Sequence, residues 1–176
     1  MKDTMPSNYP VTSVSSVLKG LTFAQAESPV QIAQARELFL EYAQSLGFSL
    51  CFQNFDKELA GLPGDYVLTE GRLLLAEFQG ELAGCVALHN LEAGICEMKR
   101  LYLRPLFRGR GAGRALAERI IAEARQIGYR RMRLDTVAPV MKDAVAMYRK
   151  LGLRKSLPTA RTRLRAHYIW SWNCEY

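Results

Sequence analysis

The stretch from Cys96 to Leu116, CEMKRLYLRPLFRGRGAGRAL, constrains the fold more than any other part of this chain. An alternating run typical of a β-strand, Glu97 to Leu103, is followed by Pro105, the glycine-rich turn Arg108 to Gly113 and a helical Ala/Leu/Ile pattern. Glycines let the backbone turn tightly and come close to a ligand, and the first N–H groups of a helix have no partner within it. The helix dipole adds partial positive charge there. Six basic residues and no acid lie between Lys99 and Arg114, so the stretch predicts a site for a phosphate-rich ligand.

Charge is distributed unevenly along the chain. Residues 1–98 hold 5 Lys and Arg against 12 Asp and Glu, a balance of −7, whereas residues 99–176 hold 19 against 5, a balance of +14. We interpret the second half as a surface that faces an anion, although any single arginine can simply solvate a helix face or a strand edge. Nucleic acid is an alternative partner for a basic half. The sequence argues against it, because it has neither a helix-turn-helix signature nor interleaved RNP-like aromatic residues.

The 176 residues suit a single domain. We expect a flexible leader over residues 1–19, which are rich in Ser, Thr, Asn and Pro, and one domain over residues 20–176. The sequence has no apolar run of the ~20 residues that span a bilayer, and no secretory signal. The cysteines lack CxxC pairing, so we predict no metal site, no disulfide framework and a cytoplasmic protein. They are Cys51, Cys85, Cys96 and Cys174.

Hydrophobic periodicity predicts a mixed α/β order of elements. Ser28 and Pro29 are typical of a helix start, and Gly47, Gly128 and Gly152 of helix ends. Predicted helices cover residues 29–46, 49–62, 115–127 and 141–150, and predicted strands cover residues 21–26, 72–78, 82–88, 97–103 and 130–137. One or two closing strands are expected in the tail, with residues 166–170 as the clearest segment.

The strand, helix and strand from Glu97 to Val137 form a βαβ unit, in which the strands are normally parallel. A Rossmann site competes as an explanation, because Asp135 ends the second strand where a ribose-binding acid would lie. The glycines follow GxGxG rather than GxGxxG, however, and residues 104–107 separate them from the strand. A P-loop fits less well still, because no Lys-Ser/Thr follows the glycines. The antiparallel hairpin that precedes the unit fits neither fold.

Three parts of the sequence resemble the GNAT superfamily of N-acetyltransferases: the Arg-x-x-Gly-x-Gly of Arg108 to Gly113, Glu97 upstream, and Met147 to Leu153 downstream. The resemblance covers roughly residues 73–153. It implies an α/β (α+β) fold with a mixed, mostly antiparallel central sheet, splayed between two parallel strands and flanked by helices. It also implies an acetyl-CoA-dependent enzyme that acetylates a primary amine of a small molecule or a protein. A homodimer is plausible for this family.

The resemblance places acetyl-CoA in the splay between the two parallel strands. Its pyrophosphate would lie on the backbone N–H groups of the glycine turn, with added charge from the arginine side chains. Its pantetheine would pair with the strand, where the Leu103 N–H would polarise the thioester carbonyl. The implied cofactor-binding residues are Leu101, Tyr102, Leu103, Arg108, Gly109, Arg110, Gly111, Ala112, Gly113 and Arg114.

Two residues are implied in catalysis. Glu97 has the spacing from the glycine turn at which many GNAT enzymes place the carboxylate that deprotonates the amine. The alternative is an acid at the rim that pairs with Lys99 or Arg100. Tyr148 lies where the family commonly places a tyrosine that protonates the CoA thiolate, which the ordinary pKa values of about 10 and about 8.5 allow. The alternative is a core residue of its helix.

Other positions carry less information. Met141 stands where many family members have an Asn, and it cannot make the same hydrogen bonds. We interpret His89 and His167 as structural residues. Acceptor specificity is expected from residues 42–66 and the C-terminal strands, where Phe48, Phe52 and Phe55 could line a pocket or pack in the core. An acyl-CoA sensor without turnover would need the same glycine turn.

Overall fold

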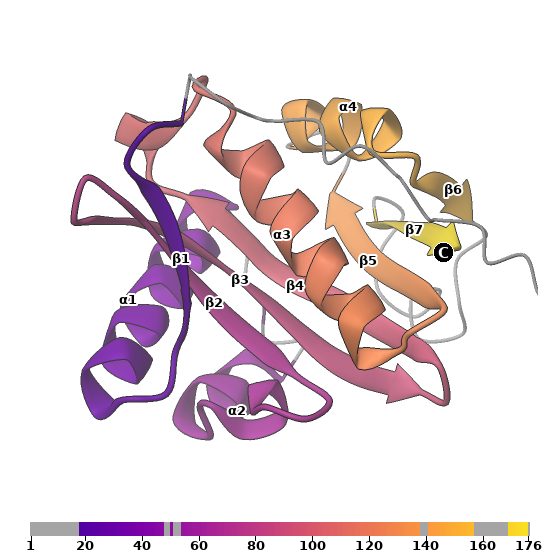
Figure 1. Ribbon diagram of the computed structural model, residues 1–176, viewed down its shortest axis with the longest axis horizontal. Coiled ribbons are helices and arrows are strands. Elements are labelled where there is room, and N and C mark those ends of the chain that lie inside the picture. The colour runs from indigo at the N-terminus through magenta and orange to yellow at the C-terminus, as the bar shows by residue number, and fades with distance from the viewer. Residues whose placement is uncertain (1–17, 48–49, 51–53, 138–140, 157–168, 176) are drawn as a thin grey trace, which may run out of the picture.

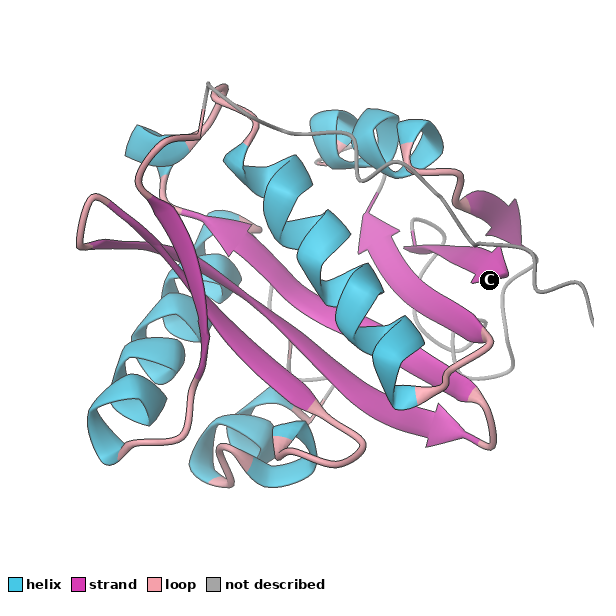
Figure 2. Ribbon diagram, viewed as in Figure 1, coloured by secondary structure: helices cyan, strands magenta, loops and turns pink. Residues whose placement is uncertain are grey.

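The computed structural model describes residues 18–47, 50, 54–137, 141–156 and 169–175, which build one sheet with helices on both faces (Figures 1 and 2). The strands are β1 (Leu21–Gln25), β2 (Arg72–Phe78), β3 (Glu81–Glu92), β4 (Ile95–Leu103), β5 (Arg131–Val137), β6 (Arg154–Ser156) and β7 (Ile169–Glu175). The helices are α1 (Pro29–Ser45), α2 (Phe55–Ala60), α3 (Ala112–Ile127) and α4 (Lys142–Lys150), with short 3-10 turns η2 (Gly64–Tyr66) and η3 (Pro105–Phe107).

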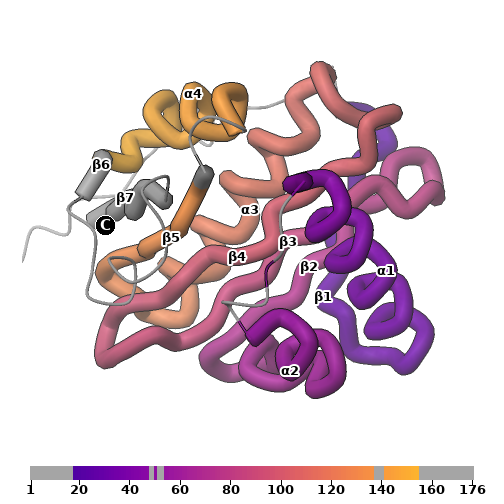
Figure 3. Tube along the Cα trace, turned by 180° about the vertical axis from the view of Figure 1, so that it is seen from behind, coloured from indigo at the N-terminus to yellow at the C-terminus, as the bar shows by residue number. Residues whose placement is uncertain are grey.

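Helices α1 and α2 cover one face of the sheet and α3 covers the other, as a comparison of Figure 1 with the view from behind in Figure 3 shows. Each face has its own apolar cluster. The cluster under α3 includes Leu88, Met98, Leu116 and Ile120, and α4 adds Val145 and Tyr148 to it. The cluster under α1 and α2 includes Leu38, Phe39, Leu73 and Leu75. Successive residues of β2 therefore alternate between two buried faces, which explains its uninterrupted apolar run.

Local sequence signals account for most element boundaries. The Ser28 side chain accepts the N–H of Gln31, and the Gln31 side chain accepts the N–H of Ser28, which completes a capping box ahead of Pro29. Gln79 and Gly80 both have positive φ, as a two-residue turn between β2 and β3 requires. Gly128 ends α3 in the left-handed conformation.

The sheet order is β1-β2-β3-β4-β5-β7-β6, and β4 with β5 is its parallel pair. The other strand pairs are antiparallel. The pairing of β4 with β5 covers Ile95 with Arg131, Cys96 with Met132 and Glu97 with Arg133, and no further residues. Beyond these pairs the two strands diverge toward their C-terminal ends (Figure 1). The predicted fold, a mixed sheet splayed between two parallel central strands, is confirmed.

Of the helix expected over residues 49–62, the structure shows α2 over Phe55–Ala60. Asn54 precedes it with a left-handed φ of 54°, and residues 49 and 51–53 lie outside the described residues. The predicted leader lies outside the described residues except for Leu18 and Lys19, and residues 166–168 of the predicted tail strand also lie outside them. In the described part of the chain no helix has the length and apolar character that crossing a bilayer requires.

Candidate active site

Strand β4 contains a bulge at Arg100. Ala87 of β3 pairs with Lys99, and Cys85 pairs with Tyr102, so β4 has one residue more than β3 between these pairs. Arg100 has a φ of 56°, a conformation that non-glycine residues rarely adopt. The bulge interrupts the hydrogen-bond ladder with β3 in the part of β4 beyond Glu97, which is not paired with β5.

The bulge also changes which face of the sheet each side chain reaches. Met98 lies in the cluster under α3, and strict alternation would place Tyr102 beside it. Tyr102 instead packs in the cluster under α1 and α2, whereas Leu103 packs under α3. The backbone of β4 is therefore rotated where it borders the opening.

The free edge of β4 faces β5 at Leu103. The N–H of the next residue, Arg104, donates to the carbonyl of Ala83 on β3 at 2.9 Å. Backbone groups of successive residues point to opposite edges of a strand, so the Leu103 N–H points away from β3. Because the pairing of β4 with β5 ends at Glu97, this N–H lies at the opening between the two strands.

The glycine turn presents a series of backbone donors at the same end of the sheet. Gly109 and Gly111 have φ of 76° and 82°, and Gly111 precedes α3 without a side-chain cap or an acid in the first turn. The first helical bond runs from the Ala115 N–H to the Gly111 carbonyl at 3.0 Å. In the described chain, the N–H groups of residues 109–114 donate to no acceptor. Uncapped donors at a helix N-terminus are a binding site for phosphate.

The arginines of the turn are not equivalent. Arg108 folds back, donating from Nε to the Leu103 carbonyl at 2.8 Å and placing its guanidinium 5.6 Å from the centre of the Tyr102 ring. Arg114 pairs with Glu118 at 2.8 Å on the surface of α3. Arg110 is exposed and forms no ion pair within the described residues. Arg110 is therefore the arginine of the turn whose charge is available.

Tyr148 of α4 is buried, and it shares the cluster under α3 with Leu103 and Ala112. Burial, together with the nearby Tyr42 hydroxyl, raises the pKa of Tyr148 well above its ordinary value. Within the described residues its hydroxyl forms no hydrogen bond. A buried phenol without a partner is uncommon, and a bound ligand can supply the missing partner.

Glu97 lies opposite His89 of β3, and Glu97 Oε2 is 2.7 Å from His89 Nε2. Burial raises the pKa of Glu97, but the His89 hydrogen bond and the charges of Lys99, His89 and Arg100 outweigh it, so the pKa lies below its ordinary value. Lys99 and Arg100, the partners expected for a rim acid, pair with Glu58 instead. The described partner of Glu97 is therefore a histidine that the sequence indicated only as structural.

Glu58 of α2 is the centre of a polar cluster beneath the bulge. It accepts from Arg100 Nε at 3.1 Å, from Arg100 Nη2 at 2.6 Å and from the Tyr66 hydroxyl at 2.5 Å. Lys99 Nζ lies 3.7 Å away. Burial raises the pKa of Glu58, but the bonds and charge of Arg100 outweigh it and hold the pKa low.

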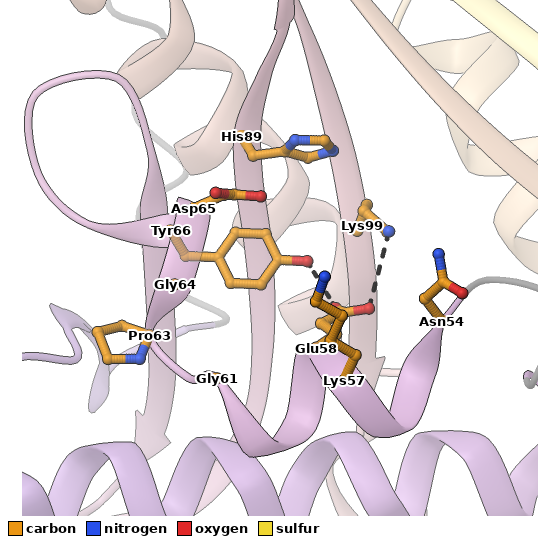
Figure 4. A pocket seen from close by; sticks show the side chains of 10 residues that line it. All are labelled: Asn54, Lys57, Glu58, Gly61, Pro63, Gly64, Asp65, Tyr66, His89 and Lys99. Atoms are coloured by element: carbon orange, nitrogen blue, oxygen red, sulfur yellow. Dashed lines mark hydrogen bonds and ion pairs between the residues drawn. The ribbon is translucent and has the colours of Figure 1, made fainter.

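A pocket of about 360 Å³ opens beside this cluster (Figure 4). Its size suits a small organic ligand. The lining comes from α2, η2, β3 and β4. Except for His89 and Lys99, its residues lie within the segment 42–66 that the sequence indicated for acceptor specificity. The lining residues are Asn54, Lys57, Glu58, Gly61, Pro63, Gly64, Asp65, Tyr66, His89 and Lys99. Phe55 packs against Arg100 instead, and Phe48 and Phe52 lie outside the described residues.

Comparison with known proteins decides the family. The model of the Acetyltransferase (GNAT) family matches residues 32–153. This chain belongs to the GNAT acetyltransferase family. An uncharacterized N-acetyltransferase of Schizosaccharomyces pombe is 36% identical over 140 residues, which cover 78% of this chain and 85% of the relative. This chain is thus an acetyltransferase enzyme.

Solved structures agree with this fold. A GNAT-family acetyltransferase of Staphylococcus aureus aligns with a TM-score of 0.72 and 14% identity, covering 88% of this chain and 98% of that one. A GNAT acetyltransferase of Elizabethkingia anophelis, solved with acetyl-CoA bound, aligns with a TM-score of 0.63 and 18% identity, covering 89% and 99%. At these identities the likeness concerns the fold.

In this GNAT enzyme the apolar cluster under α3 contains Leu103 at the strand end, Ala112 of the glycine turn and Tyr148. Glu97 points toward the other face, where His89 contacts it. Met141 begins α4 and accepts a hydrogen bond from the Thr136 hydroxyl through its sulfur at 3.4 Å. Among the described residues no group of three His, Cys, Asp or Glu side chains is arranged to hold a metal ion.

Equal counting from the turn at Ala93 and Gly94 would place Asn90, not His89, opposite Glu97. A register shift between Asn90 and Glu92 brings His89 opposite Glu97 instead. Neither this shift nor the bulge at Arg100 is marked by a glycine in the sequence.

Proposed function

We propose that this GNAT enzyme transfers the acetyl group of acetyl-CoA to a primary amine of a small molecule or a protein. One observation carries the proposal: among the described residues, β4 is unpaired with β5 at the Leu103 N–H, and the N–H groups of the nearby glycine turn donate to no acceptor. In acetyl-CoA a pantetheine arm joins the thioester to a pyrophosphate. The arm can pair with a strand edge, and the pyrophosphate needs an anion site next to that edge.

In this proposal acetyl-CoA binds along β4. The N–H groups of residues 109–114 hold the pyrophosphate, and Arg110 adds charge. The pantetheine amides pair with Leu101 to Leu103 at the edge that β5 leaves free. The Leu103 N–H donates to the thioester oxygen, which becomes more negative as the amine attacks. Arg108 contacts the same strand residue, through its bond to the Leu103 carbonyl.

The chemistry requires a neutral amine and a protonated leaving group. As the C–N bond forms and the C–S bond breaks, an ammonium acceptor loses two protons and the CoA sulfur gains one. We assign the carboxylate of Glu97 to the removal of the amine proton, and the Tyr148 hydroxyl to the protonation of the CoA thiolate. Tyr148 is suited to this because it is buried, retains its proton at neutral pH and is unpartnered in the described chain.

The acceptor amine would bind in the pocket between α2, η2 and β3. Two carboxylates line this pocket, and that of Glu58 is paired with Arg100. The other, Asp65, is exposed, and Lys57 lies on the same rim of the pocket. A small primary amine or the amino end of a peptide fits these dimensions.

A cytoplasmic location and a homodimer belong to the same proposal. The buried free thiols of Cys85 and Cys96 are compatible with a reducing compartment.

Thermal unfolding with and without acetyl-CoA tests the proposal first, with NADH and a short DNA duplex as controls. Acetyl-CoA at about 100 times its dissociation constant should raise the free energy of unfolding by ~2.7 kcal/mol and the melting temperature by several degrees. An amine panel of amino acids, polyamines, arylalkylamines and short peptides is then assayed for CoA release. A shift with acetyl-CoA and no acetylated amine would indicate an acyl-CoA sensor, and a shift with NADH or DNA alone would contradict the proposal.

A further inference from the structure

His89 lies between the candidate acceptor pocket and Glu97. Its side chain is among those that line the pocket, whereas Glu97 is not among the described lining residues (Figure 4). Both side chains are largely buried, with 16% of His89 and 20% of Glu97 exposed. An amine bound in this pocket therefore contacts the imidazole, and the carboxylate lies on the far side of the ring.

The hydrogen bond to Glu97 decides which ring nitrogen carries the proton. The lowered pKa keeps Glu97 ionised at neutral pH, and an ionised carboxylate can only accept. His89 Nε2, at 2.7 Å from the carboxylate, must therefore be the N–H donor. In a neutral imidazole this leaves Nδ1 with a free lone pair, and within the described residues no donor is bonded to it.

A second contact fixes the plane of the ring. The Tyr66 ring lies edge-on to the imidazole, with centroids 6.0 Å apart and an interplanar angle of 85°. Tyr66 is itself held by the bond from its hydroxyl to Glu58. The orientation of His89 is thus set on one side by Glu97 and on the other by η2, which is the arrangement of a base preorganised by its neighbours.

We propose that His89 is the general base of the transfer, accepting the amine proton at Nδ1, and that Glu97 is a positioning residue that holds Nε2 protonated. The proposal rests on the proposed function, in which it replaces Glu97 by His89 as the group that takes the amine proton. The ammonium gives one proton to His89 Nδ1 and attacks the thioester carbon as a neutral amine. When the C–S bond breaks, the second proton leaves the nitrogen, Tyr148 protonates the sulfur, and His89 releases its proton to solvent through the pocket.

Several titratable and charged groups face His89. They are Glu97 and Lys99 on β4, Lys57 and Glu58 on α2, and Asp65 and Tyr66 on η2. The pKa values of Glu58 and Glu97 are lowered and that of Tyr66 is raised. These three groups therefore keep one protonation state near neutral pH.

The ring nitrogens report the arrangement directly, without any acceptor. In the full chain labelled with ¹⁵N-histidine, the two histidines give separate long-range ¹H–¹⁵N patterns, and a His167→Gln variant assigns them. We expect neutral His89 to be protonated at Nε2, and Glu97→Gln to yield a mixture of tautomers. Protonation of wild-type His89 at Nδ1 would overturn the proposal.

Kinetics supply the second readout, with an amine that the wild-type protein acetylates. His89→Gln, which can retain a hydrogen bond to Glu97, should lower kcat by roughly 10²-fold or more. Added imidazole should partly restore His89→Ala. Glu92→Gln, which introduces the same glutamine at an exposed position of β3, should leave kcat unchanged.

The outcomes separate the two proposals. Turnover of His89→Gln within about threefold of wild type overturns the role of His89 and leaves the acetyltransferase intact. Absence of acetylation by the wild-type protein contradicts the proposed function instead. The thermal shift with acetyl-CoA, which is expected to be equal in wild type and His89→Gln, shows that the variant is folded and binds the co-substrate.

Discussion

Arg100 and Glu58 form a two-point ion pair that joins the bulge of β4 to helix α2, with distances of 3.1 Å from Nε and 2.6 Å from Nη2. The guanidinium also lies 5.1 Å from the ring centre of Phe55 and 5.8 Å from that of Tyr42. A left-handed backbone costs a non-glycine residue roughly 1–2 kcal/mol. These contacts offset that cost. Through them the Arg100 side chain links the acceptor pocket to the strand edge proposed for acetyl-CoA.

Glu58→Gln should destabilise the fold by about 3 kcal/mol, because it leaves the buried Arg100 charge without its counter-ion. Urea unfolding followed by circular dichroism measures the loss. Arg114→Gln, which breaks the exposed pair with Glu118, is the matched control and should cost less than about 1 kcal/mol. Equal losses in the two variants would mean that the bulge does not depend on the buried pair.

The same pair predicts how stability changes with pH. The folded-state pKa of Glu58 is lowered, so its stabilisation is complete above the ordinary glutamate value of about 4.3 and is lost as pH falls through the folded value. Glu123 behaves alike: burial raises its pKa, but bonds from Arg72 and Arg119 outweigh this.

Unfolding free energies measured from pH 7 to pH 3 check this expectation. They should fall below about pH 4.5, and the deficit of Glu58→Gln relative to wild type should shrink over the same range, because wild-type Glu58 then becomes neutral too. A deficit that stays constant down to pH 3 would contradict a lowered pKa for Glu58.

Much of the fold was predictable because its local signals agree with each other. The helix start at Ser28 and Pro29, the hairpin of strands β2 and β3 and the helix stop at Gly128 lie where the sequence indicated. The splay followed from the resemblance rather than from periodicity. No pattern in the residues of β4 indicates that its pairing with β5 stops at Glu97.

The parts that sequence reasoning missed depend on contacts between distant segments. Arg100 adopts a left-handed φ because Glu58, 42 residues earlier, holds its side chain. The start of α2 at Phe55 follows the left-handed Asn54, and asparagine tolerates that conformation without requiring it. Glu97 faces His89 across the hairpin because of a register shift between Asn90 and Glu92, which no residue pattern indicates.

Gly111→Ala should weaken acetyl-CoA binding by at least tenfold, because a side chain at the first uncapped turn of α3 hinders the close approach of a phosphate. The space at Gly111 is open, so the variant should fold with only the strain of a left-handed alanine. Gly128→Ala is the matched control at the other end of α3, with a φ of 103° and similarly open surroundings. Binding is measured by calorimetry.

Both alanine variants should lose about 1–2 kcal/mol of stability from the left-handed conformation. Only Gly111→Ala should lose affinity. If Gly128→Ala weakens binding as much, the effect of the first variant is one of general stability, and the glycine turn is not the phosphate site.

Tyr148→Phe should lower kcat by roughly 10²-fold while leaving the affinity for acetyl-CoA nearly unchanged, because it removes the proton intended for the CoA thiolate and little of the packing. Since the described chain provides no hydrogen-bond partner for this hydroxyl, unfolding stability should not fall. The matched control is Tyr129→Phe, whose hydroxyl donates to the Glu70 carbonyl at 2.8 Å. That variant should lose about 1 kcal/mol of stability and keep its turnover. Stopped assays of CoA release, paired with urea unfolding, separate the two responses, and unchanged turnover in Tyr148→Phe would remove this tyrosine from the mechanism.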